Sequence, residues 1–328
     1  SGDLMPVSRR TFLSGLGAAG ALSALPAPSS AAIARTAATC PFRLSVINDE
    51  ISQDFDHAAS VAANDFGLRW IELRGMWNKN ITDLDANQLA ESQRILKKYD
   101  LRVTDIASPL FKVDWPGAPT KTKQRDEFHA DFGFHQQDAL LDHCIDLART
   151  FSTDRIRCFD FWRLQDVKPY REAMNRKLAE AAEKCAQHNL ILILENEMDC
   201  NTATGEEAAA TLAAIPNHNF MLNWDPGNAG TFPGDVPYPD GYDLLPKDRI
   251  GHCHAKNVKR EPDGKYDWEP VGTGVVDWVG QLRALRRDGY HYAVSLETHW
   301  RGAGTPEASS RISMADLKKA LADSGAAC

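Results

Sequence analysis

Short apolar runs alternate with amphipathic segments along most of the chain. Continuous apolar runs of this length are typical of strands that are buried on both faces of a parallel sheet. The apolar runs are Phe42–Ile47, Trp70–Leu73, Val103–Ala107, Ile156–Phe161, Leu190–Leu194, Phe220–Trp224, Ile250–His254 and Tyr292–Leu296. The segments with helical periodicity between them are Asp85–Lys98, Phe134–Arg149, Tyr170–His188, Glu206–Ile215, Trp278–Asp288 and Ser313–Ala322.

The order of these segments predicts an α/β fold. Strands that alternate with helices form βαβ units, and eight such repeats in about 290 residues predict a (β/α)8 TIM barrel in a single domain. The main rival is a doubly wound open sheet, which usually has a glycine-rich turn after its first strand. The chain has Asn48, Asp49 and Glu50 at that place. The long interval Ser108–Asp154 leaves room for a lid over the barrel mouth.

Residues 1–38 are predicted to be a Tat-type signal peptide and linker, and residues 39–328 to be the barrel. Arg9 and Arg10 stand before a mildly apolar segment, and Ala32 and Ala34 are the small residues that a signal peptidase reads. A tail without an export role is the alternative. The resemblance to a bacterial twin-arginine signal implies export to the periplasm. Because no later apolar run reaches the roughly 18 residues that span a bilayer, we expect no stable membrane anchor after processing.

Composition narrows the class of partner. Hydrophobic residues are 43% of the 328-residue chain and charged residues are 25%, an ordinary balance for a globular protein. The formal net charge of -8 argues against a nucleic-acid partner, whose phosphates are usually neutralised by basic residues. A homo-oligomer stays open. The 7 cysteines form no Cys-x-x-Cys pair, and because their number is odd, at least one thiol lies outside any intrachain disulfide.

Acidic and histidine residues close four successive apolar runs: Glu195, Asp225, His254 and Glu297. In a barrel, the groups at the carboxyl ends of the strands form the active site. Any one of these residues alone is more typical of a surface position, a helix cap or a buried histidine. Three carboxylates at one barrel mouth repel each other unless a cation lies between them. Carboxylate oxygens and one imidazole suit one divalent ion, Mn²⁺, Mg²⁺, Co²⁺ or Zn²⁺.

Two of these ligand assignments have close competitors. Side chains alternate between the two faces of a strand, so His252 shares the face of His254 one layer deeper. Glu197 competes with Glu195 in the same way.

Four segments resemble the sugar phosphate isomerase/epimerase family of the xylose-isomerase-like TIM barrels. They are Leu194–Asn196, Trp224–Asn228, His252–Lys256 and Val271–Trp278, and the likeness covers most of residues 42–300. The resemblance implies that Glu195, Asp225, His254 and Glu297 bind one divalent metal ion. It also implies that the two glutamates exchange a proton alpha to a carbonyl, through a metal-bound enediolate, on a small carbohydrate substrate.

Departures from the family pattern leave the reaction open. Characterised ketose 3-epimerases have a histidine where this chain has Asn228, a glutamate at Asn201 and an aspartate at Asn257. Isomerisation or epimerisation is the leading prediction. A dehydratase or lyase that acts on a keto-sugar, keto-inositol or 3-keto-glycoside is the alternative, and a periplasmic sugar-binding protein is the non-enzymatic one.

Further polar and aromatic residues near the strand ends are predicted to contact the substrate. The candidates are Lys256, Arg260, Asn228, Glu72, Trp224 and His299. Arg260 matches a substrate-binding arginine of the family. An ion pair is the alternative for Lys256 and Glu72, a solvated loop for Arg260, and a loop cap for His299. Indole rings pack on the C–H faces of sugars, and Trp268 is one of several tryptophans placed to do so.

Overall fold

A computed structural model of the chain describes residues 40–122, 132–326 and 328. The predicted signal peptide and part of the predicted lid lie outside these described residues. None of the helices within the described residues has both the length and the hydrophobicity that a bilayer crossing requires.

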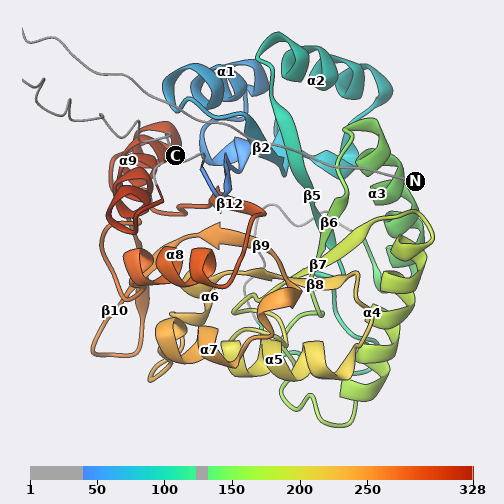
Figure 1. The fold of residues 1–328 in the computed structure, drawn as a ribbon. Coiled ribbons are helices and arrows are strands. Elements are labelled where there is room, and N and C mark those ends of the chain that lie inside the picture. Colours follow the sequence, from blue (N-terminus) through green and yellow to red (C-terminus); the bar gives the residue numbers. More distant parts are fainter. Residues whose placement is uncertain (1–39, 123–131, 327) are drawn as a thin grey trace, which may run out of the picture. The chain divides into compact units, whose positions relative to one another are not determined.

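The central feature of the fold is a ring of eight parallel strands with helices outside it (Figure 1). The strands lie in the order β1, β12, β9, β8, β7, β6, β5, β2, and a bridge between Ile47 and Glu72 joins the two ends of this order. This confirms the predicted TIM barrel. The eight barrel strands are β1 (Arg43–Val46), β2 (Trp70–Leu73), β5 (Arg102–Leu110), β6 (Arg155–Cys158), β7 (Ile191–Glu195), β8 (Phe220–Trp224), β9 (Ile250–Ala255) and β12 (Ala293–Leu296).

Two hairpins stand beside the barrel, β3 (Gly75–Met76) with β4 (Lys79–Asn80) and β10 (Asn257–Arg260) with β11 (Tyr266–Glu269). The helices are α1 (Phe55–Ser60), α2 (Ala86–Lys98), α3 (Gln137–Thr150), α4 (Arg171–Ala186), α5 (Gly205–Ala214), α6 (Pro226–Ala229), α7 (Tyr242–Leu244), α8 (Trp278–Arg287) and α9 (Pro306–Asp323). Short 3-10 and π turns complete the chain: η1 (Asn48–Glu50), η2 (Val61–Asp65), η3 (Ile81–Asp83), η4 (Phe134–Gln136), η5 (Pro237–Gly241) and η6 (Lys247–Arg249).

Side chains that accept hydrogen bonds from backbone amides fix the starts of several helices. Asp85 and Thr204 each form a capping box, at the starts of α2 and α5. Thr305 caps α9, which begins at Pro306 and not near Ser313 as the periodicity predicts. The first turns of α9 bury small polar residues such as Ser310, whose hydroxyl donates to the Glu50 carbonyl at 2.6 Å. A buried serine does not register as apolar, so the pattern misses this part of the helix.

A disulfide joins Cys40, just before β1, to Cys328, after α9. Among the described residues the other cysteines are free and buried, namely Cys144, Cys158, Cys185, Cys200 and Cys253.

The barrel interior carries a layer of charged and polar side chains beneath the strand ends. Glu72, Asp105, Asn223 and His252 are fully buried there, and they contact each other from four different strands. TIM-barrel interiors are usually filled by branched apolar residues. We therefore expect this buried polar layer to support the groups at the strand ends above it.

Candidate metal centre

The four predicted ligands come together at the carboxyl ends of β7, β8, β9 and β12. Glu195, Asp225, His254 and Glu297 each offer one atom, and these atoms all lie within 4.8 Å of one another. His254 Nδ1 is 3.4 Å from Glu195 Oε1, 3.6 Å from Asp225 Oδ2 and 3.2 Å from Glu297 Oε2. All four side chains are buried. We refer to them below as the quartet.

Local structure aims one oxygen of each carboxylate at the quartet and secures the other. Asp225 caps α6, and its Oδ1 accepts from the Asn228 amide at 2.9 Å. Glu195 Oε2 accepts from Arg157 at 3.0 Å. Glu297 Oε1 accepts from Arg74 at 2.6 Å. The inner oxygens are Asp225 Oδ2, Glu195 Oε1 and Glu297 Oε2. Asn228 Nδ2 donates to Glu195 Oε1 at 3.3 Å, and Lys256 Nζ donates to Glu297 Oε2 at 2.6 Å.

The electrostatics of the quartet favour a cation. Burial raises the pKa of Glu195, but His254 and Arg157 outweigh it and lower that pKa to about 2. Burial also raises the pKa of Glu297, which Lys256, His299 and His254 bring well below its usual range. Burial lowers the pKa of His254, yet the surrounding carboxylates of Glu72, Glu195 and Glu297 raise it well above its usual range. Glu195 and Glu297 are thus ionised at neutral pH, and they draw positive charge onto the imidazole.

The residues present fit a divalent ion. Asp225 Oδ2 is buried and accepts no hydrogen bond from the described residues, although Lys256 Nζ lies 2.8 Å from it. The same ammonium lies 2.6 Å from Glu297 Oε2. Lys256 thus offsets part of the negative charge of these oxygens, and the fit to a divalent ion rests on the convergence of three carboxylates and one imidazole at one point. Carboxylate oxygens with one imidazole nitrogen are the donor set that Mn²⁺, Mg²⁺ or Zn²⁺ accepts.

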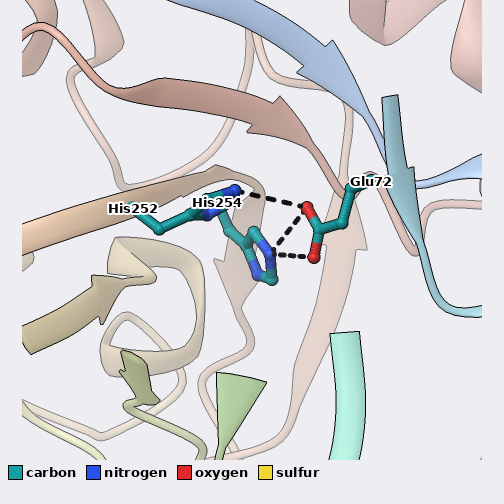
Figure 2. A group of neighbouring side chains, drawn as sticks. All are labelled: Glu72, His252 and His254. Carbon is teal, nitrogen blue, oxygen red and sulfur yellow. Dashed lines mark hydrogen bonds and ion pairs between the residues drawn. The ribbon is translucent and has the colours of Figure 1, made fainter. Parts of the chain in front are cut away.

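Two further groups of acidic and histidine residues adjoin the quartet. Glu50, Glu297 and His299 form one of them. The guanidinium of Arg74 already balances the negative charge of this group, because it lies 3.0 Å from Glu50 and 2.6 Å from Glu297. Figure 2 shows the other, in which Glu72 on β2 faces His252 and His254 on β9.

A pocket of about 230 Å³ opens above the quartet. Its lining residues are Arg74, Pro109, Lys112, Arg157, Phe159, Glu195, Glu197, Met198, Asp199, Trp268, Glu297 and His299. The Trp268 ring lies edge-on to His299, with centroids 5.5 Å apart, and stands 5.0 Å from Lys256 Nζ. The pocket therefore gives a ligand access to the two glutamates between aromatic walls.

The structure brings some of the predicted substrate residues to this region. His299 lines the pocket. Lys256 and Asn228 lie against the quartet, because Lys256 Nζ contacts Asp225 and Glu297, and Asn228 Nδ2 donates to Glu195 Oε1 at 3.3 Å.

Other predicted substrate residues lie away from the pocket. Trp224 is buried on the outer face of the barrel, and its indole donates to Gln281 on α8 at 3.0 Å. Arg260 donates to the carbonyls of Gly230, at 2.6 Å, and of Asp235, so it holds β10 onto the loop after α6. Glu72 is fully buried behind His254.

Arg74 and Arg157, which hold the two glutamates, were not predicted from the sequence. Both stand at the end of, or within, an apolar run in the first half of the chain. A charged residue inside a buried strand needs a buried partner of opposite charge. An arginine in or next to an apolar run was therefore a signal for a buried ion pair. The partners of these arginines, Glu297 and Glu195, lie on strands further along the chain, so the spacing of residues in the sequence does not identify them.

The barrel and the acidic centre at its mouth define a class of α/β-barrel proteins, and sequence comparison assigns the family. The chain belongs to the xylose isomerase-like TIM barrel family, whose model matches residues 61–320. No curated protein matches the chain in sequence.

Solved structures share the fold at low identity. A xylose isomerase-like TIM barrel protein from Mycobacterium smegmatis in complex with magnesium is 16% identical, with a TM-score of 0.63 over 87% of this chain and 98% of that one. The probable 3-DHS dehydratase AsbF from Bacillus anthracis is 23% identical, with a TM-score of 0.60 over 84% and 97%. D-psicose 3-epimerase with D-tagatose from Clostridium cellulolyticum H10 is 14% identical, with a TM-score of 0.60 over 87% and 100%.

Proposed function

We propose that this protein is a divalent-metal-dependent sugar isomerase or epimerase, which moves a proton alpha to a carbonyl group. The observation that carries the proposal is the convergence of Glu195, Asp225, His254 and Glu297, whose ligand atoms all lie within 4.8 Å of one another. The fold neighbours, one in complex with magnesium and one with D-tagatose, support it.

The quartet would hold the ion through one atom of each residue. When bound there, a divalent ion polarises a substrate carbonyl and makes the adjacent C–H more acidic. Mn²⁺, Mg²⁺, Co²⁺ and Zn²⁺ are all compatible with three carboxylates and an imidazole.

The protein's own groups would position the substrate and move the proton. Phe159 and Trp268 line the pocket and would pack on the apolar C–H faces of a sugar. The proton would be taken at the outer oxygen of a glutamate, Oε2 of Glu195 or Oε1 of Glu297, since the inner oxygens would hold the ion. Arg157 and Arg74 donate to these outer oxygens and keep the carboxylates ionised, ready to act as bases.

A dehydratase acting on a keto-sugar or keto-glycoside is the second candidate, and His299 favours it. His299 Nδ1 lies 2.8 Å from the buried Glu50, which leaves Nε2 3.6 Å from Glu297 Oε1 at the pocket wall. With its hydrogen on Nδ1, a neutral His299 ring presents a lone pair at Nε2. The doubly protonated ring would instead give a proton from Nε2 to a departing hydroxyl group, which elimination needs and epimerisation does not.

We also propose that the protein is exported in a folded state to the periplasm. The disulfide between Cys40 and Cys328 supports this location, because disulfides persist in oxidising compartments and are rare in the cytosol.

Elemental analysis of the purified protein tests the metal centre. We expect a stoichiometric divalent ion in the wild type and its loss in Glu195→Gln and Asp225→Asn. Glu197→Gln is the matched control, because Glu197 lies two residues after Glu195 and lines the same pocket. Retention of the ion in both quartet variants, or its loss only in the control, would contradict the assignment.

NMR in D₂O with a panel of ketoses, aldoses and keto-glycosides tests the reaction. Deuterium at an alpha carbon without loss of water supports an isomerase or epimerase. Loss of water supports the dehydratase. Tight binding of an unchanged sugar that survives a chelator supports a sugar-binding protein instead.

A further inference from the structure

Glu72 lies at the end of β2, on the far side of His254 from the quartet. Its Oε1 and Oε2 are 3.0 and 3.2 Å from His254 Nε2 (Figure 2). Both side chains are fully buried. The other ring nitrogen, Nδ1, is the one that faces Glu195, Asp225 and Glu297.

A neutral imidazole carries a hydrogen on one ring nitrogen and a lone pair on the other. A carboxylate can only accept, so a hydrogen bond to Glu72 places the hydrogen on Nε2 and the lone pair on Nδ1. That tautomer is the one that can bind a cation in the quartet. A carboxylate behind a metal-binding histidine fixes the ring's direction in the same manner in many metal sites.

We infer that Glu72 is a positioning residue for the metal centre, which orients His254 and selects the tautomer that presents Nδ1. The inference rests on the proposed metal-dependent function. It assigns Glu72 a role other than contact with the substrate, because Glu72 is not among the residues that line the pocket.

Within the part of the chain that the structure describes, the other polar neighbour of His254 Nε2 does not perform this task. Asn223 Nδ2 lies 3.1 Å from it, but an amide nitrogen is a donor and cannot accept the ring hydrogen. The amide oxygen of Asn223 is engaged by His252 Nδ1 at 2.9 Å. The carboxylate of Glu72 is thus the acceptor that His254 meets on this side.

The layer beneath the quartet also supplies a matched control. Asp105 is a second fully buried carboxylate, and its Oδ1 lies 3.2 Å from His252 Nε2. Asp105 resembles Glu72 in charge, burial and histidine partner, but its partner is not in the quartet. A purely structural or long-range electrostatic effect would be shared by both carboxylates, whereas a positioning effect belongs to Glu72 alone.

Titration of the metal-free full chain with Co²⁺, followed by visible absorption, tests the inference. We expect Glu72→Ala to weaken Co²⁺ binding about 10- to 100-fold. Glu72→Gln keeps an acceptor oxygen and should recover part of this loss. Asp105→Asn should leave the Co²⁺ affinity close to that of the wild type. Circular dichroism confirms that each variant is folded.

Equal weakening in Glu72→Ala and Asp105→Asn, or unchanged affinity in a folded Glu72→Ala, would overturn the positioning role while leaving the metal centre in place. A wild type that binds no Co²⁺ would instead remove the proposed function, and this inference with it.

A second measurement needs no variant. In ¹⁵N NMR of the wild type loaded with Zn²⁺, we expect the hydrogen of His254 on Nε2. A hydrogen on Nδ1 would overturn the inference.

Discussion

At the residue scale, the two oxygens of each glutamate in the centre have different partners. Glu195 turns one oxygen toward His254 and the other toward Arg157, and Glu297 divides its oxygens between the quartet and Arg74. The arginines therefore hold the carboxylates in place before any ion binds. They also limit the basicity of the outer oxygens, which suits a substrate whose C–H is already acidified.

Removal of Arg157 should lower the stability of the metal-free protein. Arg157→Met leaves the buried carboxylate of Glu195 without its ion-pair partner, and breaking a buried pair typically costs about 3–5 kcal/mol. We expect a loss of that order in the free energy of unfolding of the metal-free protein, measured with urea. Added Mn²⁺ should restore part of it. A variant as stable as the wild type would show that the pair does not matter for folding.

Acid should destabilise the metal-free protein through the same carboxylates. The pKa of Glu195 is lowered from 4.5 to about 2 in the folded chain, so its contribution to stability is present above 4.5 and is lost as the pH falls toward 2. Urea unfolding across this range should show a steeper loss in the wild type than in Glu195→Gln. Parallel curves would contradict the lowered pKa.

At the element scale, the sequence predicted every barrel strand, because a strand covered on both faces is a continuous apolar run. It also predicted the quartet, since the carboxyl ends of parallel strands share one rim. Helix α1, after β1, was not predicted, because Phe55–Ser60 is too short for a clear helical period. Buried serines hid the start of α9. Trp224 was predicted to contact the substrate. Its side chain instead faces the outer helices, because its indole donates to Gln281 on α8.

The start of α9 should depend on Thr305. Its hydroxyl accepts from the Ala308 amide at 3.1 Å, and loss of such a cap costs about 1 kcal/mol. Thr305→Ala should therefore lower the free energy of unfolding by about that amount. Thr305→Ser, which keeps the hydroxyl, should behave as the wild type. Equal loss in both variants would argue against the cap.

At the scale of the whole molecule, the disulfide closes the chain around the barrel. Cys40 and Cys328 are 288 positions apart, so their bond restricts the unfolded chain strongly. We expect a reducing agent to lower the free energy of unfolding by about 2–4 kcal/mol. Cys40→Ser should show the same lower stability and no response to the reductant. If the free energy of unfolding of the wild type does not change with the reductant, the disulfide does not have this stabilising role.

In the molecule as a whole, the quartet lies beneath a pocket with aromatic walls, and Glu72 in the buried layer orients His254 toward the other three ligands. The most direct test is anomalous X-ray diffraction from crystals grown with Mn²⁺. We expect a single strong peak at about 2.0–2.3 Å from Glu195 Oε1, Asp225 Oδ2, His254 Nδ1 and Glu297 Oε2. No peak among these atoms, or a peak bound by His252 or Glu197 in their place, would contradict it.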